Sequence, residues 1–179
     1  MEFQTIKAED LSMNVIQSIR YDWLLITGGD KDNYNSMTAC WGGIGHLWDN
    51  HHCCFIFIRP SRYTYEFLEK YDYFTIQFFN EKYKDKLHFL GTTSGRDMDK
   101  IEKVDFTPIF SKNNSVYYEE AKMVIDCKKI YYQDIDPENF LDKSVDNWYK
   151  ENYPEDGYHR MYVGSIDDIL IKNDEKKIK

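Results

Sequence analysis

The stretch that decides the fold is HHCCFIFIRPSRYTYEFLEKYDYFTIQFF, residues 51–79. Its first part is a continuous apolar run ended by Pro60, which is typical of a strand buried on both faces. Apolar residues then recur at helical spacing, so the segment 62–71 is predicted to be an amphipathic helix capped by Ser61 or Thr64. The apolar segment that follows the helix predicts a second strand.

The rest of the chain repeats this mixture of strands and short helices. Strands are also predicted at 22–29, at 158–172 and twice within 115–135, and helices at 8–19, at 81–91 where Gly91 ends the helix, and at 97–104, with a turn at 136–140. Many strands with a few inserted helices favour a mainly β fold of the α+β class, in particular a β-barrel. The alternation is too irregular for a doubly wound sheet. A chain of 179 residues is expected to form one domain, 1–179.

Composition excludes several classes of function. The chain carries 23 Lys and Arg against 31 Asp and Glu, a formal net charge of −8, which argues against a general nucleic-acid binder but allows a local anion site. No apolar run approaches the roughly 20 residues of a membrane span, and the N-terminus does not read as a secretory signal. The four cysteines contain no redox Cys-x-x-Cys pair, so we expect a cytoplasmic protein with reduced thiols.

The turn between the first predicted strand and helix concentrates hydrogen-bond donors. Arg59 and Arg62 offer charged, planar donors, and Ser61, Tyr63 and Thr64 add hydroxyl groups. The start of the helix adds backbone N–H groups and the positive end of the helix dipole. The turn therefore predicts a phosphate site, although both arginines could instead pair with surface acids such as Glu66.

A second segment, TTSGRDMDK at 92–100, has the same design. Ser94, Gly95 and Arg96 could form a backbone nest for an anion, a helix is expected to start at Asp97, and Lys100 would follow one turn later. The alternative is an ordinary glycine loop with a helix cap. Two such segments in one acidic chain favour an anion site.

A third segment, NYNSMTACWGGIGHLW at 33–48, suits a flat ligand. Its small residues let such a ligand approach the backbone, Asn35, Ser36 and Thr38 could bond a heteroaromatic edge, and Trp41 could wall the pocket. The glycine spacing does not match a dinucleotide fingerprint. The alternative is a glycine-bulged strand with core tryptophans.

A phosphate cradle beside a site for a planar, polar-edged ligand describes flavin mononucleotide (FMN). With DWLLITGGD, NSMTACWGG, RPSRYTYEFLE, SGRDMDK, QDIDPENF and YHRMYVG in this order, the chain resembles the flavin reductase-like, FMN-binding split-barrel family, in particular its flavoredoxin-like branch. The resemblance implies a Greek-key split β-barrel with peripheral helices, a homodimer, and FMN held noncovalently near the subunit interface.

The matched motifs imply which residues hold the cofactor. The ring system would lie against Asn35, Ser36, Met37, Thr38, Ala39, Cys40 and Trp41. The phosphate and ribityl chain would contact Arg59, Ser61, Arg62, Tyr63 and Thr64, and the phosphate end would be closed by Ser94, Gly95, Arg96, Asp97 and Lys100. His159 matches a histidine of the family.

The resemblance also implies an activity. We expect an FMN-dependent oxidoreductase that passes electrons from NAD(P)H to flavin or to a downstream acceptor, in which the flavin carries the hydride chemistry and no catalytic acid or base is required. The alternative is an FMN-binding electron-transfer module that does not oxidise NAD(P)H. A weaker alternative is a heme or pyridoxamine-phosphate binder on a similar barrel.

The remaining reactive residues are not assigned to sites. The run HHCC at 51–54 suggests zinc, but consecutive strand residues point to opposite faces and do not bind one ion, so no metal is expected. Cys127, beside two lysines, is either a thiol of lowered pKa or, as we favour, a buried structural thiol. His46 either approaches the flavin or lies on the surface.

Overall fold

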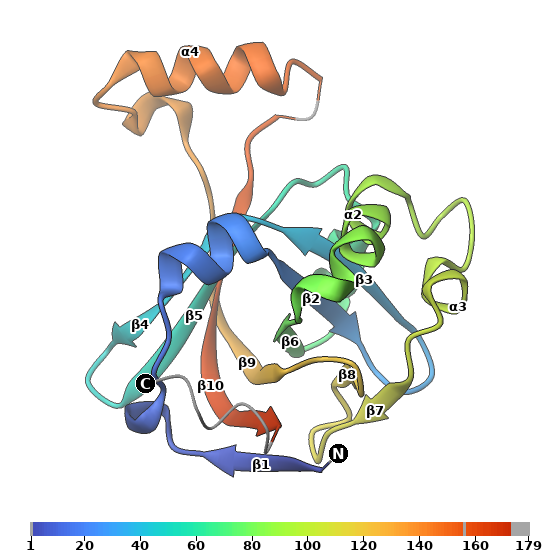
Figure 1. Cartoon of the computed structure of the whole chain (residues 1–179). Coiled ribbons are helices and arrows are strands. Elements are labelled where there is room, and N and C mark those ends of the chain that lie inside the picture. The colour runs from blue at the N-terminus through green and yellow to red at the C-terminus, as the bar shows by residue number, and fades with distance from the viewer. Residues whose placement is uncertain (1, 156, 173–179) are drawn as a thin grey trace.

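The computed structural model describes residues 2–155 and 157–172, and it is mainly antiparallel sheet (Figure 1). The strands are β1 Phe3–Ile6, β2 Leu24–Gly29, β3 Tyr34–Ala39, β4 Gly42–Leu47, β5 His51–Ile58, β6 Tyr73–Phe78, β7 Pro108–Phe110, β8 Val116–Tyr118, β9 Met123–Asp134 and β10 Arg160–Lys172. The α-helices are α1 Tyr63–Lys70, α2 Lys84–Thr92, α3 Lys100–Val104 and α4 Lys143–Asn152. A π-helix spans Gln17–Asp22, and 3-10 turns span Ala8–Asp10, Glu81–Tyr83 and Pro137–Asn139.

The main sheet has eight strands in the order β3-β2-β6-β9-β10-β5-β4, with β1 paired to β10. It curls into a barrel that stays open, because β3 and β4 are its two edges and do not pair with each other. The chain passes from one edge to the other through Cys40 and Trp41. The expected α+β fold with a split β-barrel and peripheral helices is therefore confirmed.

Two hydrophobic cores share strand β2, which is buried on both faces. Leu24 and Ile26 face the barrel interior with residues of β5, β6 and α1. Leu25 faces a second core, formed under α2, α3 and β8. Helix α1 approaches β2 closely, since a Cβ on Gly28 would lie 3.1 Å from Cβ of Phe67. This contact fixes where α1 begins relative to the sheet.

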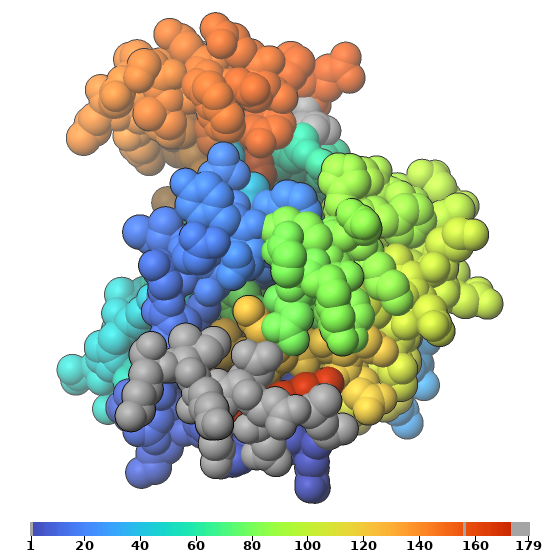
Figure 2. Space-filling view, viewed as in Figure 1, coloured from blue at the N-terminus to red at the C-terminus, as the bar shows by residue number. Residues whose placement is uncertain are grey.

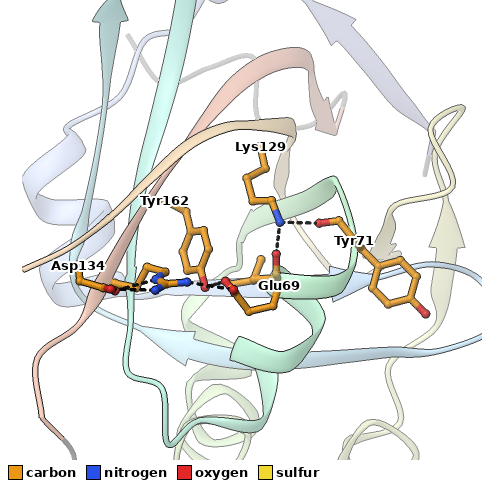
Figure 3. Close-up of polar contacts among 7 residues, drawn as sticks. Glu69, Tyr71, Lys129, Asp134 and Tyr162 are labelled. Atoms are coloured by element: carbon orange, nitrogen blue, oxygen red, sulfur yellow. Dashed lines mark hydrogen bonds and ion pairs between the residues drawn. The ribbon is translucent and has the colours of Figure 1, made fainter.

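A polar network holds the other end of α1 on the sheet (Figure 3). Tyr162 of β10 donates to Glu69 of α1 at 2.5 Å, and Arg160 reaches the same carboxylate at 2.9 Å. Arg160 also makes a two-point contact with Asp134 of β9, at 2.7 and 2.8 Å. Lys129 of β9 donates to the carbonyls of Leu68 and Tyr71. These contacts orient α1, so that its N-terminus points away from the network.

An arm, whose described residues are 135–155 and 157–159, leaves the barrel between β9 and β10 and carries α4, which stands above the barrel in Figure 1. Sequence patterns gave no expectation for α4, β1 or β7. The arm is rich in aromatic residues that contact one another, among them Tyr149, Tyr153 and Tyr158. No helix in the described ranges is long and apolar enough to cross a membrane.

Four expectations about the helices are wrong. The segment 8–19 is not one helix: a 3-10 turn at Ala8–Asp10 is followed by four residues without helical structure, and the chain is helical again from Val15, continuing as the π-helix. Gly91 does not end α2, which continues to Thr92; the glycine instead allows close packing, since its Cβ would lie 3.1 Å from Cβ of Thr38.

The other two corrections concern helix starts. Helix α3 begins at Lys100 rather than Asp97, because Asp99 caps it by accepting from two backbone N–H groups. Neither Ser61 nor Thr64 caps α1: its N-cap residue is Arg62, and among the described residues no side chain caps it.

Candidate cofactor-binding site

A small cavity joins the three segments singled out in the sequence. It has a volume of about 70 Å³, and its lining residues are Asn35, Met37, Ser61, Arg62, Tyr63, Thr64, Leu90, Gly91, Thr93, Ser94, Gly95 and Lys100. Leu90 and Gly91 were not expected, because they lie in the last turn of α2 and carry no distinctive pattern, whereas Thr93 belongs to the segment 92–100 but was not named as a site residue. The structure thus brings the arginine turn, the glycine turn and β3 to one place.

Hydrogen bonding leaves the N-terminus of α1 open toward this cavity. Thr64 is the second residue of the helix and therefore not its N-cap residue, and its hydroxyl accepts from Nδ2 of Asn35 at 2.6 Å. Within residues 2–155 and 157–172 no side chain caps α1. An uncapped helix start presents backbone donors and positive charge, which is the usual anion site at a helix N-terminus.

Positive charges gather around Arg62. Among the described residues no carboxylate forms an ion pair with Arg62. Burial lowers the pKa of the neighbouring Arg59, and Arg62 lowers it further. Burial lowers the pKa of Lys100 to about 8 and that of His159 to about 4, and in both cases the charge of Arg62 contributes. A group of cations in which no described carboxylate pairs with the central Arg62 is suited to bind an anion.

Lys100 lines the cavity as expected, but its ammonium is buried and already bonded. It donates to the carbonyls of Leu90 at 2.8 Å and Thr93 at 3.0 Å. These bonds fix the loop after α2, which forms one wall of the cavity. Lys100 therefore positions that loop and adds positive charge at short range.

Arg96 does not line the cavity. It forms an ion pair with Glu66 and donates to the carbonyl of Ser61 at 3.0 Å, so it bridges the two turns. Its backbone N–H donates to the hydroxyl of Ser94 at 3.2 Å, so one of the three N–H groups of the expected backbone nest already has a partner within the turn. The acid Glu66 is paired with Arg96 rather than with Arg59 or Arg62.

Gly95 is required for space. A Cβ there would lie 2.2 Å from Oδ1 of Asn35 and 2.9 Å from Cδ1 of Tyr63, distances that side chains do not adopt. Any larger residue would push apart the two turns and β3.

Strand alternation divides the 35–41 segment between two faces. Asn35 and Met37 line the cavity. Ser36 points to the other core and shares hydrogen bonds with Thr27 and Tyr118, and Thr38 donates to the carbonyl of Leu87. The expectation that the hydroxyls of Ser36 and Thr38 bond a ligand is therefore wrong. Ala39 packs against the barrel core, whereas Cys40 and Trp41 line a separate groove.

Trp41 and His159 meet beneath the arm. Their rings lie 4.6 Å apart, and Trp41 also contacts Trp148, Tyr149 and Tyr153 of the arm. His159 is buried and shares a 2.5 Å hydrogen bond with the hydroxyl of Tyr149. Arg59 lies over the ring of Tyr153 at 4.5 Å. Arg59, Trp41 and His159, which were predicted to contact the cofactor, thus lie at the base of the arm. The charges of Arg59 and Arg62 still act on His159 there.

The remaining candidates lie outside the site. Cys127 is completely buried and burial raises the pKa of its thiol, so it is a structural thiol. His46 is exposed on β4 near His52. Among the described residues, no group of three His, Cys, Asp or Glu side chains is arranged to hold a metal ion.

Comparison with known proteins identifies the fold. The chain superposes on flavoredoxin from Methanosarcina acetivorans with a TM-score of 0.67 at 16% identity, covering 93% of this chain and 77% of that one. It superposes on flavoredoxin of Desulfovibrio vulgaris (Miyazaki F) with a TM-score of 0.65 at 21% identity, covering 94% and 78%. An FMN-binding protein from Thermus thermophilus with bound p-hydroxybenzaldehyde gives a TM-score of 0.66 at 17% identity, covering 95% and 82%.

Sequence comparison gives the family. Curated protein sequences give no match. The family model described as "Flavin reductase like domain" matches residues 18–178, which is most of the chain and includes every segment that forms the cavity. The chain therefore belongs to the flavin reductase-like domain family.

Proposed function

We propose that this protein binds FMN and transfers electrons through it. The observation that carries the proposal is the cavity at the start of α1, where Arg62 has no acid partner among the described residues and Arg59 and Lys100 lie nearby. In a chain with a net charge of −8, such a cluster is best explained by an anionic ligand. The matching family and the FMN-binding structural neighbours support FMN as that ligand.

The cavity fits the phosphate of FMN and not its ring. A volume of about 70 Å³ accommodates one phosphate-sized group, so the three-ring system would lie outside. Strand β3 leads away from the cavity and is an edge strand, paired only with β2 among the described strands. Its other edge presents unpaired backbone N–H and C=O groups, which suit the polar edge of a flat ring. Asn35 and Met37 would lie where the two parts of the ligand join.

Bound FMN would supply hydride and single-electron transfer. The chain's own residues bind and orient: Arg62 and the α1 N–H groups hold the phosphate, and Lys100 fixes the neighbouring loop. His159 has a pKa of about 4, so at neutral pH it is uncharged and adds no positive charge. No acid or base of this chain is assigned to the chemistry.

Comparing FMN with riboflavin tests the proposal. Riboflavin has the same ring without the phosphate, so it should bind at least about 10-fold more weakly, since charge-assisted hydrogen bonds to phosphate contribute about 1.5–3 kcal/mol. Calorimetric titration of apoprotein with both flavins measures the difference. Equal affinities would show that the cationic cavity does not hold the phosphate, and no binding of either flavin would overturn the proposal.

We propose NAD(P)H as the electron source, with flavin or a downstream acceptor receiving the electrons. The family supports this, but the alternative of an electron-transfer module without NAD(P)H oxidation uses the same cavity. Anaerobic mixing of FMN-loaded protein with NADH or NADPH separates them: loss of the oxidised flavin absorbance within seconds indicates a reductase. Absorbance that is unchanged by either nucleotide, but lost with dithionite, indicates the electron-transfer module.

We further propose that the protein is a cytoplasmic homodimer. The arm exposes Leu141 completely, with Val145 and Trp148 also exposed, and a symmetric partner would cover such apolar surface. All four cysteines lie in the described ranges and form no disulfide, which fits a reducing compartment. A monomer mass by light scattering at micromolar concentration would exclude the dimer.

A further inference from the structure

An open apolar groove of about 380 Å³ shares no lining residue with the phosphate-sized cavity. In Figure 2 the arm (orange) lies directly above the N-terminal segment (blue) that forms one side of this groove. The lining residues are Val15, Ile16, Ile19, Arg20, Cys40, Trp41, Gly42, Phe57 and Ile135. A volume of this size lies in the range of about 300–1,000 Å³ that is typical of small-molecule sites.

Arg20 is the one charged residue among the groove's described lining residues. It is exposed, and no described carboxylate forms an ion pair with it. Its guanidinium lies 5.7 Å from the ring of Tyr21, a surface contact. Arg20 therefore lies at the edge of an apolar groove, and no described carboxylate pairs with it although the chain is rich in acids. An arginine in this position is suited to bind an anionic group.

The backbone that presents Arg20 is unusual. Residues Gln17–Asp22 form a π-helix, a rare conformation that is frequent at functional sites. Trp23 follows with a positive φ of 70°, which is uncommon for a bulky residue. Lys84 of α2 holds this conformation: its ammonium lies 3.7 Å from the Trp23 ring centroid and donates to the carbonyl of Tyr21. The distortion is thus supported by specific contacts and is not a frayed helix end.

The groove lies at the far end of the strand that leaves the cavity. Asn35 and Met37 of β3 line the cavity, whereas Cys40 and Trp41, which follow the end of β3 at Ala39 and connect it to β4, line the groove. A ligand that extends from the cavity along β3 would therefore point toward the groove.

We propose that this groove is a second ligand site, for a small aromatic anion such as an aromatic carboxylate. Its ring would lie against Trp41, Phe57 and Ile135, and its charge would pair with Arg20. The size of the groove and its single positive charge favour this ligand over a second copy of the chain. The inference rests on the proposed function only in placing the site beside the flavin, because binding in the groove is measurable without flavin.

The test compares 2-naphthoate with its neutral analogue 2-naphthalenemethanol by calorimetry, on apoprotein and on FMN-loaded protein. The wild type should bind the carboxylate about 5- to 10-fold more tightly. Arg20→Gln should remove this preference while the affinity for FMN is unchanged. Lys31→Gln, which removes a charge from the exposed turn between β2 and β3, is the matched control and should keep the preference.

Substitution of Ile16 locates the binding site. Ile16 is 74% exposed, so Ile16→Glu and Ile16→Lys should both fold; the first should weaken naphthoate binding and the second should preserve or strengthen it. Equal affinities for the two naphthalenes, or no effect of either charge change, would overturn the inference. The inference would also be overturned if the wild type is a dimer that does not bind naphthoate and Ile16→Glu converts it to monomers. In that case the groove is filled by the partner subunit.

If the protein binds FMN but does not bind naphthoate, the groove is not the proposed ligand site, and the proposed function stands. Binding of naphthoate without binding of FMN refutes the proposed function and leaves the groove site standing.

Discussion

Asn35 on β3 donates a 2.6 Å hydrogen bond to the hydroxyl of Thr64 in the first turn of α1, 29 residues further along the chain. This bond holds the first turn of α1 against β3. The oxygen of the same Asn35 amide lies where a Cβ of Gly95 would be, so the third segment closes on the same point. One amide thus ties together all three walls of the cavity and leaves the helix N-terminus open to a ligand.

We predict that Arg62→Ala weakens FMN binding by about 10- to 100-fold, because a forked arginine makes charge-assisted hydrogen bonds to phosphate. Riboflavin, which has no phosphate, should lose much less affinity. The melting temperature of the apoprotein should change little, because Arg62 has no acid partner among the described residues. Titrations with both flavins and apoprotein melting measure these effects. Equal losses for the two flavins would count against a phosphate role.

We predict that FMN affinity falls as the pH rises above about 8. The pKa of Lys100 in the free protein is lowered to about 8 by burial and by Arg62, and a bound phosphate dianion favours the protonated lysine. Above that pH the lysine is neutral in the free protein, so binding must take up a proton and weakens. Calorimetry between pH 7 and 10 measures the trend, and Lys100→Met should flatten it. An affinity independent of pH in the wild type contradicts the prediction.

We predict that His159 contributes to acid sensitivity. Its pKa in the folded protein is about 4, lowered from 6.5 by burial and by the positive charges of Arg59 and Arg62. The unfolded chain therefore binds more protons between pH 4 and 6.5, and the free energy of unfolding falls as the pH drops through that window, by up to about 3 kcal/mol. Urea unfolding at several pH values should show a smaller decrease for His159→Gln. Parallel curves for the two proteins would rule out this contribution.

We predict that Tyr162→Phe lowers stability and leaves FMN affinity unchanged. The Tyr162 ring stays packed, but Glu69 loses the 2.5 Å hydrogen bond that anchors the far end of α1. The expected cost is about 1–2 kcal/mol of unfolding free energy. Tyr131→Phe, which removes the hydroxyl of an exposed tyrosine bonded to Gln133, is the control and should cost little. Denaturant unfolding and flavin titration together measure both effects; a large loss of FMN affinity would show that the network shapes the cavity.

Local patterns were sufficient for most of the fold. The periodicities of 51–79 gave β5, α1 and β6 within a residue or two, because strands and amphipathic helices record their buried faces in the order of apolar residues. The sequence also identified both turns that line the cavity, through arginine, glycine and hydroxyl residues at helix starts. Helix α4 carries few periodic apolar residues, and its aromatic side chains contact other residues of the arm and Trp41 rather than the barrel core, so no pattern indicated it.

The tertiary structure alone decided which side chains share the cavity. Ser36 and Thr38 look like ligand-binding residues in sequence, but strand alternation turns them into the second core, where Tyr118 and the Leu87 carbonyl bond them. In the sequence Thr64 resembles a helix cap, but in the structure its hydroxyl accepts from Asn35. Arg96 resembles a phosphate ligand in the sequence, but in the structure it pairs with Glu66. The physical reason is the same in each case: a polar or charged side chain bonds a partner close to it in space, and for these residues that partner is brought there by the folding of segments distant in sequence.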